Sequence, residues 1–410
     1  MKPESAAAAG RTPGLALAAV PLAAMHFGGA LKSAPPLAAL PFDLTLVAGA
    51  VAIPSLALLA AGRRWRLSRA LALPLAGAAG LWLWFTLAGL WSASRPMLAV
   101  KLPEMVVLGP AMLAAGMVIA ADARTLRVFS ATTLGIGALV GAAVAWGLAT
   151  GVVVLGGAVD ARPDAIRVQY QIAGLAIASA AALAAVAAVR RQGIRRLAWL
   201  GLALVLAVAA LLPGGRAGLV GLAVAVALAP AVWFWAQGRP RASLGWVAMA
   251  LVGGTIGLAA LFLDPTAVTG FRTLERLTSG GLEASARPWL WTQALRVAGA
   301  ASPIGVGTAS FPIAAGFGEW RGRYPHNHLL EAMVEGGWPG LVLWLCCFGG
   351  AVLVAGLRLR QVAPLRAAQV AGIALPVAVS VLVSTDMGNR MVWLAAGLLL
   401  GLGVESDADA

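Results

Sequence analysis

The side chains best suited to proton transfer gather in one short segment, which holds two of the three histidines of the chain. Its sequence is Tyr324-Pro325-His326-Asn327-His328-Leu329-Leu330-Glu331. Imidazole has an ordinary pKa of about 6.5, which suits general acid or base chemistry near neutral pH. His326 stands beside arginines where a predicted loop enters a predicted helix, so we predict that it transfers a proton. His26 lies in an apolar run without a polar pattern, which favours a structural role.

The same segment contains residue types that could bind a metal ion. His326, His328, Glu331 and Glu335 all carry ligand atoms. Glu331 and Glu335 are one helical turn apart and would share a face. The group matches no established ligand spacing, however, and carboxylates in the opening turns of a helix are favoured by the helix dipole in any case. We therefore predict a site without a metal ion or another cofactor.

Arg216 is a candidate for binding an anion. It follows Leu212-Pro213-Gly214-Gly215, a predicted tight turn between two apolar runs, and it opens the second run. Glycines beside an arginine at a helix amino terminus form a good phosphate seat, because backbone N–H groups and a guanidinium group can bind the same oxygens. Snorkelling of the arginine to a membrane interface explains the same position equally well.

These residues must be positioned by membrane-spanning helices. The 410 residues are 60% hydrophobic and 11% charged, a mixture that a water-soluble domain of this length could not keep in solution. A bilayer core about 30 Å thick needs roughly 20 apolar residues per crossing. The sequence predicts an all-α polytopic membrane protein, one transmembrane domain over residues 1–410, in which the first run is a span and not a removed signal peptide. About twelve spans are expected, near 13–31, 41–62, 70–91, 103–121, 128–155, 170–189, 197–212, 217–236, 246–263, 329–355, 367–385 and 391–404.

Arginine-rich short loops predict the orientation, since such loops prefer the cytoplasm. They lie at 63–69, 124–127, 190–196, 239–241 and 358–366. Both termini fall on the same side and are expected to be cytoplasmic. The net charge of +14 does not indicate nucleic-acid binding, because the basic residues are scattered among apolar runs and cover no single exposed face. Membrane lipids and phosphate groups are the expected partners.

The opposite side carries one long connection, residues 264–327, predicted to be a helical loop subdomain inserted between spans. Six arginines occur in it: Arg272, Arg276, Arg287, Arg296, Arg321 and Arg323. An early proline, Pro288, and an apolar stripe predict a helix from about 285 to 297, and Trp289 suits a membrane interface. Arg162 and Arg167 lie in another outer loop, where nearby aspartates could simply pair with them.

In their order, these motifs resemble the O-antigen ligase and polymerase superfamily. They are the glycine-flanked Arg216, the helix start at Arg287, the segment Pro303-Ile304-Gly305-Val306-Gly307, His326-Asn327 with Leu330, and Glu335-Gly336. The ordered match covers about 213 to 345, and the predicted span arrangement extends the likeness over most of the chain. Two positions depart from the family pattern. Gly215 stands where serine is common, and His328 stands where an acidic or other polar residue is frequent, so the reactive histidine is taken as His326, directly before Asn327.

The resemblance implies an enzyme with a GT-C-like membrane fold and a large helical periplasmic loop. It would transfer O-polysaccharide from undecaprenyl pyrophosphate to a sugar hydroxyl of lipid A-core, on the periplasmic face of the bacterial inner membrane. Arg216 and Arg287 would stabilise the departing pyrophosphate, and His326 would accept the proton of the attacking hydroxyl. Inverting, metal-independent transfer without a cofactor would follow. The further residues predicted to contact substrate are Arg162, Arg167, Asn327, His328 and Trp289.

Two alternatives remain open from the sequence. A polymerase of the same superfamily would join repeat units on the same lipid carrier, and its sequence pattern differs little from that of a ligase. A twelve-span transporter of an anionic substrate belongs to another class. Transporters of this size often show two similar halves and charges paired at mid-membrane, whereas the polar residues here gather in outer loops.

Overall fold

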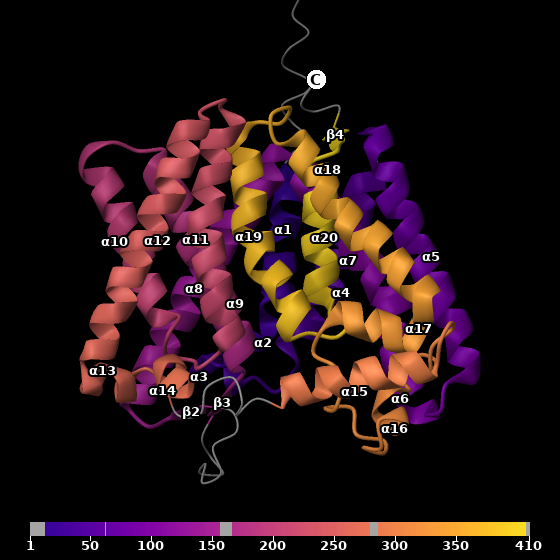
Figure 1. Ribbon diagram of the computed structural model, residues 1–410. Coiled ribbons are helices and arrows are strands. Elements are labelled where there is room, and N and C mark those ends of the chain that lie inside the picture. Colours follow the sequence, from indigo (N-terminus) through magenta and orange to yellow (C-terminus); the bar gives the residue numbers. More distant parts are fainter. Residues whose placement is uncertain (1–12, 62, 156–165, 279–285, 407–410) are drawn as a thin grey trace, which may run out of the picture.

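The computed structural model describes residues 13–61, 63–155, 166–278 and 286–406 (Figure 1). Regular structure in these residues is almost entirely helical, as expected where lipid offers the backbone no hydrogen-bond partners. The helices of the first half are α1 (Pro13–His26), α2 (Gly28–Leu31), α3 (Pro35–Ala38), α4 (Leu44–Ala61), α5 (Ala72–Ala88), α6 (Arg95–Pro103), α7 (Gly109–Ala121), α8 (Ala123–Ala149), α9 (Tyr170–Val189) and α10 (Gly193–Ala209). Those of the second half are α11 (Arg216–Ala236), α12 (Pro240–Leu263), α13 (Pro265–Gly270), α14 (Arg272–Thr278), α15 (Arg287–Ala300), α16 (Phe311–Ala314), α17 (His328–Trp344), α18 (Gly350–Arg358), α19 (Pro364–Val383) and α20 (Arg390–Gly401).

Shorter elements connect these helices. Two are 3₁₀ turns, η1 (Arg69–Leu71) and η2 (Gly89–Trp91), and two are π-helical segments, η3 (Glu104–Leu108) and η4 (Leu345–Gly349). The strands are β1 (Trp65–Leu67), β2 (Val153–Leu155), β3 (Ile166–Val168) and β4 (Val404–Ser406). β1 pairs antiparallel with β4, and β2 pairs parallel with β3. Because η3 joins α6 to α7 without a break, the predicted span at 103–121 begins earlier, at Arg95.

Eight helices in the described residues are long and apolar enough to cross a membrane. They are Arg69–Trp91, Arg95–Ala121, Ala123–Ala149, Tyr170–Val189, Arg216–Ala236, Pro240–Leu263, His328–Arg358 and Pro364–Val383. Shorter apolar helices lie at Leu17–His26, Leu44–Leu58 and Arg390–Gly401, and α10 occupies the remaining predicted span. The prediction of an all-α polytopic membrane protein is confirmed. The predicted span at 128–155 is shifted to α8, because the Asp122 carboxylate accepts a hydrogen bond from the Thr125 N–H at 2.6 Å and starts the helix there.

The connections separate to opposite ends of the helix bundle (Figure 1). The end that carries β1 and β4 also carries the turn between α18 and α19. The other end carries β2, β3 and the short helices α13, α14 and α16. There α15 runs across the ends of the spans, in the orientation expected of a helix at the membrane boundary. Leu290, Ala294 and Val297 are buried on its inner face, as the predicted apolar stripe requires.

Close packing between α9 and α11 fixes the start of α11. A Cβ atom added to Gly218 in α11 would lie 3.2 Å from the Cα atom of Gly174 in α9, so the two backbones touch. Small residues allow this approach in membrane helices, where packing replaces the hydrophobic effect as the force between helices. At Gly215 an added Cβ would lie 3.1 Å from the Tyr170 carbonyl oxygen. The backbone before Arg216 is therefore held against the first turn of α9.

The span His328–Arg358 is broken, where the sequence predicted one continuous helix. Gly337 has a φ of 63°, which interrupts α17. The segment 303–307 supplies hydrogen bonds at the break: the Val306 N–H donates to the Val334 carbonyl at 2.9 Å, and the Trp338 N–H donates to the Pro303 carbonyl at 2.9 Å. Irregular backbone at membrane depth is tolerated where other parts of the protein satisfy it. The Pro303–Gly307 motif thus anchors the connection to α17.

We expect Gly337→Ala to lower the thermal stability of the protein. A left-handed backbone costs a non-glycine residue about 1–3 kcal/mol, and an added Cβ would also lie 2.6 Å from the Ile304 carbonyl carbon. The unfolding midpoint in detergent measures the effect. Gly349→Ala is the matched control, because it lies in the same span and a Cβ there meets no atom within 4 Å. Equal midpoints for both variants would contradict the described break.

Candidate functional site: an arginine-lined cavity

A cavity of about 340 Å³ lies where α9, α11, α14 and α15 meet the loop before α17. Its lining residues are Tyr170, Gln171, Gly215, Arg216, Ala217, Arg276, Ala286, Arg287, Leu290, Trp320, Gly322, Arg323 and His326. We call it the arginine cavity, since four of these residues are arginines. Among the described residues that line it, none is acidic. Such a cavity favours an anion with several charges.

Arg216 reaches the arginine cavity from the first position of α11. Gly215, Arg216 and Ala217 all line the cavity, so the amino terminus of the long helix α11 forms part of its wall. The positive end of the helix dipole and the guanidinium group act in the same direction on a bound anion. Of the two explanations that the sequence left open for Arg216, this geometry favours the anion seat.

Arg276 and Arg287 face the cavity from two other elements. The Arg276 Nη1 atom donates to the Gly214 carbonyl at 2.9 Å, and its guanidinium lies 5.1 Å from the centre of the Tyr170 ring. Arg287 opens α15. Burial lowers the pKa of the Arg287 guanidinium from its usual value, and the charges of Arg216 and Arg276 lower it further. Positive groups held this close repel one another, so an anion between them relieves the repulsion.

His326 is held at the cavity by contacts on both sides of its loop. Its φ of 55° is a left-handed conformation that few residues adopt, although histidine does so more often than most. The Tyr324 ring centre lies 3.9 Å from the imidazole, and the Tyr324 hydroxyl donates to the Ser384 carbonyl at 3.1 Å. The Trp291 indole N–H donates to the Pro325 carbonyl at 2.9 Å. α15 and the turn after α19 therefore fix the position of this loop.

The surroundings of His326 favour its neutral form. The Nδ1 atom lies 3.5 Å from the Ser384 carbonyl oxygen, so a proton on Nδ1 would leave Nε2 as the acceptor. Burial lowers the pKa of the imidazole from its usual value, and the charges of Arg287 and Arg323 also lower it. The Ser384 carbonyl and the charge of Asp386 act in the opposite direction. A neutral imidazole can accept a proton, which is what a general base must do.

The other predicted contacts lie elsewhere in the described structure. Asn327 caps α17, since its Oδ1 atom accepts hydrogen bonds from the N–H groups of Leu329 at 3.0 Å and Leu330 at 3.1 Å. His328 is fully buried, with Nε2 3.0 Å from the Thr385 hydroxyl. Trp289 is 49% exposed and packs against Phe317. None of the three is among the lining residues of the arginine cavity.

The last two arginines that the sequence predicted to contact substrate are Arg162 and Arg167, and the structure describes neither side chain. Arg162 lies outside the described residues, as do the aspartates expected to pair with it. Arg167 lies in strand β3, but its side chain is outside the description.

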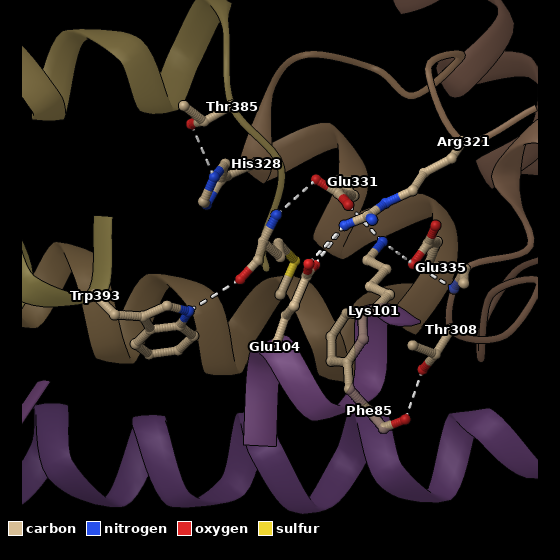
Figure 2. A network of polar contacts seen from close by, with 12 residues as sticks. Phe85, Lys101, Glu104, Thr308, Arg321, His328, Glu331, Glu335, Thr385 and Trp393 are labelled. Carbon is tan, nitrogen blue, oxygen red and sulfur yellow. Dashed lines mark hydrogen bonds and ion pairs between the residues drawn. The ribbon is translucent and has the colours of Figure 1, made fainter. Parts of the chain in front are cut away.

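Glu331 and Glu335, considered above as metal ligands, bind an ammonium group (Figure 2). Lys101 of α6 pairs with Glu331, and its Nζ atom lies 2.5 Å from the Glu335 Oε2 atom. This ammonium group lies between the two carboxylates, where a metal ion bound by both would have to lie. Nearby, Arg321 makes a two-oxygen ion pair with Glu104, at 2.8 and 2.6 Å.

Sequence reasoning missed Arg276 and Arg323 as cavity residues. Both belong to the six arginines of the 264–327 connection, but spacing along a loop does not show which side chains converge. The tyrosines of the sequence could have indicated the site, because the chain has only two tyrosines and both lie at or beside the arginine cavity. Tyr170 lines the cavity beneath Arg276, and Tyr324 stacks on His326. Arg323 lies 4.5 Å from the Trp320 ring centre, a cation–π contact that holds it in place.

Comparison with known protein families finds a match, which lies almost entirely in the second half of the chain. Residues 201–345 match the O-antigen ligase family. The match confirms the resemblance to the O-antigen ligase and polymerase superfamily. No curated protein matches the chain.

The segment that matches the O-antigen ligase family supplies most of the arginine cavity. Arg216, Arg276, Arg287, Arg323 and His326 all fall within residues 201–345. The α9 residues of the wall and the Lys101 side chain come from outside the matched segment.

Proposed function

We propose that this protein is an O-antigen ligase, which transfers O-polysaccharide from undecaprenyl pyrophosphate to a sugar hydroxyl of lipid A-core. The family match supports a function of the O-antigen ligase or polymerase type in general. The observation that carries the finer proposal is the meeting of four guanidinium groups and one imidazole in a single cavity. A diphosphate and a hydroxyl that must lose a proton need these two kinds of group.

The arginines stabilise the leaving group in the proposed reaction. Breaking the bond between the anomeric carbon and the diphosphate oxygen places negative charge on the departing pyrophosphate. Arg216, Arg276, Arg287 and Arg323 approach from three helices and one loop, and the α11 amino terminus adds its dipole. Because these groups are fixed before the reaction, they stabilise charge that develops in the transition state more than charge already present in the ground state.

His326 is the general base in the proposed reaction. The acceptor hydroxyl attacks the anomeric carbon from the side opposite the diphosphate, and the imidazole takes the hydroxyl proton. One displacement forms the new glycosidic bond and breaks the old one, so the anomeric configuration inverts. Arginines supply the positive charge at the leaving group, so we propose that the transfer is metal-independent and uses no cofactor.

The proposal also assigns the two ends of the helix bundle. We propose that the arginine cavity faces the periplasm of the bacterial inner membrane and that both termini are cytoplasmic. The short arginine-rich connections and the carboxy-terminal strand β4 lie at the end opposite α13–α16 (Figure 1). Under the rule that such connections remain in the cytoplasm, the cavity lies on the other side.

A defined acceptor distinguishes the ligase from its alternatives. In proteoliposomes that contain undecaprenyl-pyrophosphate-linked polysaccharide and lipid A-core, a ligase joins the polysaccharide to lipid A-core. A polymerase instead lengthens the lipid-linked chain and leaves lipid A-core unmodified. A transporter moves the donor across the bilayer without forming a new bond. Unmodified lipid A-core in the presence of an active donor would contradict the ligase proposal.

The pH dependence of transfer is expected to report the state of His326. Because the pKa of this imidazole lies below the usual value of a histidine, the base is neutral at neutral pH and becomes protonated only as the pH falls below that usual value. We expect kcat/KM to be constant near neutral pH and to fall as the pH decreases below that value. Arg323→Gln should move this fall to higher pH, since it removes a charge that disfavours the imidazolium. pH–rate profiles of both proteins measure the shift, and an unmoved profile in the variant would contradict the assignment.

A further inference from the structure

A buried ion-pair network lies next to the arginine cavity without lining it (Figure 2). Lys101 comes from α6 and is 7% exposed, while Glu331 and Glu335 of α17 are 0% and 1% exposed. The Lys101 ammonium contacts both carboxylates. Charged groups are rarely buried unless they are paired, and breaking such a pair leaves a charge without compensation. A lysine held in this way fixes the parts of the chain that it joins.

Both carboxylates also bind backbone groups of other loops. Glu331 Oε2 accepts a hydrogen bond from the Met387 N–H at 3.1 Å, and Glu335 Oε2 accepts one from the Ala309 N–H at 2.8 Å. The network therefore joins α6 and α17 to the turn between α19 and α20 and to the loop that follows Gly307. A satisfied network of this kind rigidifies the segments it connects.

Two of these connections lead to segments that adjoin or contact His326. Glu331 lies in the first turn of α17, four residues after the cap Asn327, and Asn327 directly follows His326. Met387 belongs to the turn that begins at Ser384, whose carbonyl contacts the His326 ring and the Tyr324 hydroxyl. Two segments support the imidazole: the start of α17 and the turn from Ser384 to Met387. The Glu331 carboxylate belongs to the first and hydrogen-bonds the second, and Lys101 forms an ion pair with this carboxylate.

We propose that Lys101 is a positioning residue for His326. It holds the Glu331 carboxylate, and through it the helix start and the turn that orient the imidazole. The inference rests on the proposed role of His326 as general base. Lys101 is absent from the lining of the arginine cavity. Three of the cavity arginines come from α11, α14 and α15, and the hydrogen bonds described above for the network go to none of these helices. Its loss should therefore lower the rate of transfer without weakening the binding of the diphosphate.

The test measures kcat for transfer to lipid A-core and the Kd for undecaprenyl pyrophosphate, using the full chain in proteoliposomes. Lys101→Met is expected to lower kcat by about 100-fold, the order of effect of a misplaced catalytic group, while Kd stays unchanged. Lys32→Met is the matched control, since it breaks a partly exposed ion pair with Asp43, and neither residue lines the arginine cavity. It should change neither quantity.

A variant that removes the two carboxylates together with Lys101 distinguishes a positioning role of Lys101 from charge balance and from misfolding. In Lys101→Met/Glu331→Gln/Glu335→Gln no buried carboxylate is left without a cation, and the glutamines can still accept the two backbone hydrogen bonds. Positioning by Lys101 predicts that this variant binds undecaprenyl pyrophosphate normally but keeps a low kcat. Recovery of kcat would show that Lys101 only balances charge and would overturn the proposal. Failure of this variant to bind undecaprenyl pyrophosphate would show a general structural role and overturn it as well.

A double-mutant cycle tests whether Lys101 acts through the imidazole. If it does, Lys101→Met/His326→Gln is no slower than His326→Gln alone, because the base that Lys101 positions is already missing. Independent effects that multiply would contradict the proposal. Normal turnover in Lys101→Met together with an inactive His326→Gln would reject the positioning role alone. Turnover that survives in His326→Gln would reject the general base itself, which is part of the proposed function.

Discussion

His326→Gln is expected to lower kcat for transfer by about 10²- to 10⁴-fold, the usual contribution of a general base. Glutamine approximates the size of histidine and can donate to the Ser384 carbonyl, but it cannot accept a proton near neutral pH. The diphosphate is bound by the arginines, so the Kd for undecaprenyl pyrophosphate should stay close to that of the unaltered protein. Single-turnover transfer and equilibrium binding, measured on the same preparation, give both quantities.

His328→Gln provides the comparison for this prediction, since the sequence favoured His326 over His328 only by its place directly before Asn327. The His328 ring is buried against Thr385 and Phe348, outside the lining of the arginine cavity. Its replacement should lower the yield or thermal stability of the protein and leave kcat of the folded fraction far above that of His326→Gln. The reverse order of kcat values would move the base to His328.

Arg287→Gln is expected to lower transfer by about 10²- to 10³-fold, the effect of removing one donor from a preorganised anion site. Arg216→Gln should have a similar effect, because the Arg216 and Arg287 side chains both line the arginine cavity. Part of the loss should appear as weaker binding of undecaprenyl pyrophosphate, since the diphosphate is charged before the bond breaks. Measuring Kd and kcat separately divides the effect between the ground state and the transition state.

A second arginine of the same helix is the control for Arg287. Arg296 also lies in α15, but its guanidinium hydrogen-bonds the Gln293 side chain at 3.0 Å on an exposed surface. Arg296→Gln removes the same charge at a distance from the cavity, so transfer should remain near normal. Equal losses in the two variants would mean that the net charge of the loop matters and that the arginine cavity does not.

The sequence was sufficient to predict most of the spans and three of the residues that line the arginine cavity. Apolar runs of span length predict helices in lipid whatever their partners, because the backbone must satisfy itself internally. The helix that begins at Arg287 also follows from local signals, an early proline and an apolar stripe. His326 and Arg216 were found because their residue types are rare or specially placed, and the structure brings both to the cavity with Arg287.

What the sequence could not predict depends on contacts between distant segments. Lys101 and Glu331 are 230 positions apart, and nothing in either segment indicates its partner. The break at Gly337 is made possible by hydrogen bonds from the 303–307 segment, which a local pattern does not contain. Arg323 is distinguished from Arg321 only by its neighbours, since one stacks on Trp320 and the other pairs with Glu104.

The most direct test of the account is an experimental structure with undecaprenyl pyrophosphate bound. We expect the diphosphate in the arginine cavity, within hydrogen-bond distance of Arg216 and Arg287, with the His326 imidazole facing the position where the sugar of the donor would begin. A diphosphate bound at any other surface, with these three side chains facing an empty cavity, would contradict the proposed mechanism.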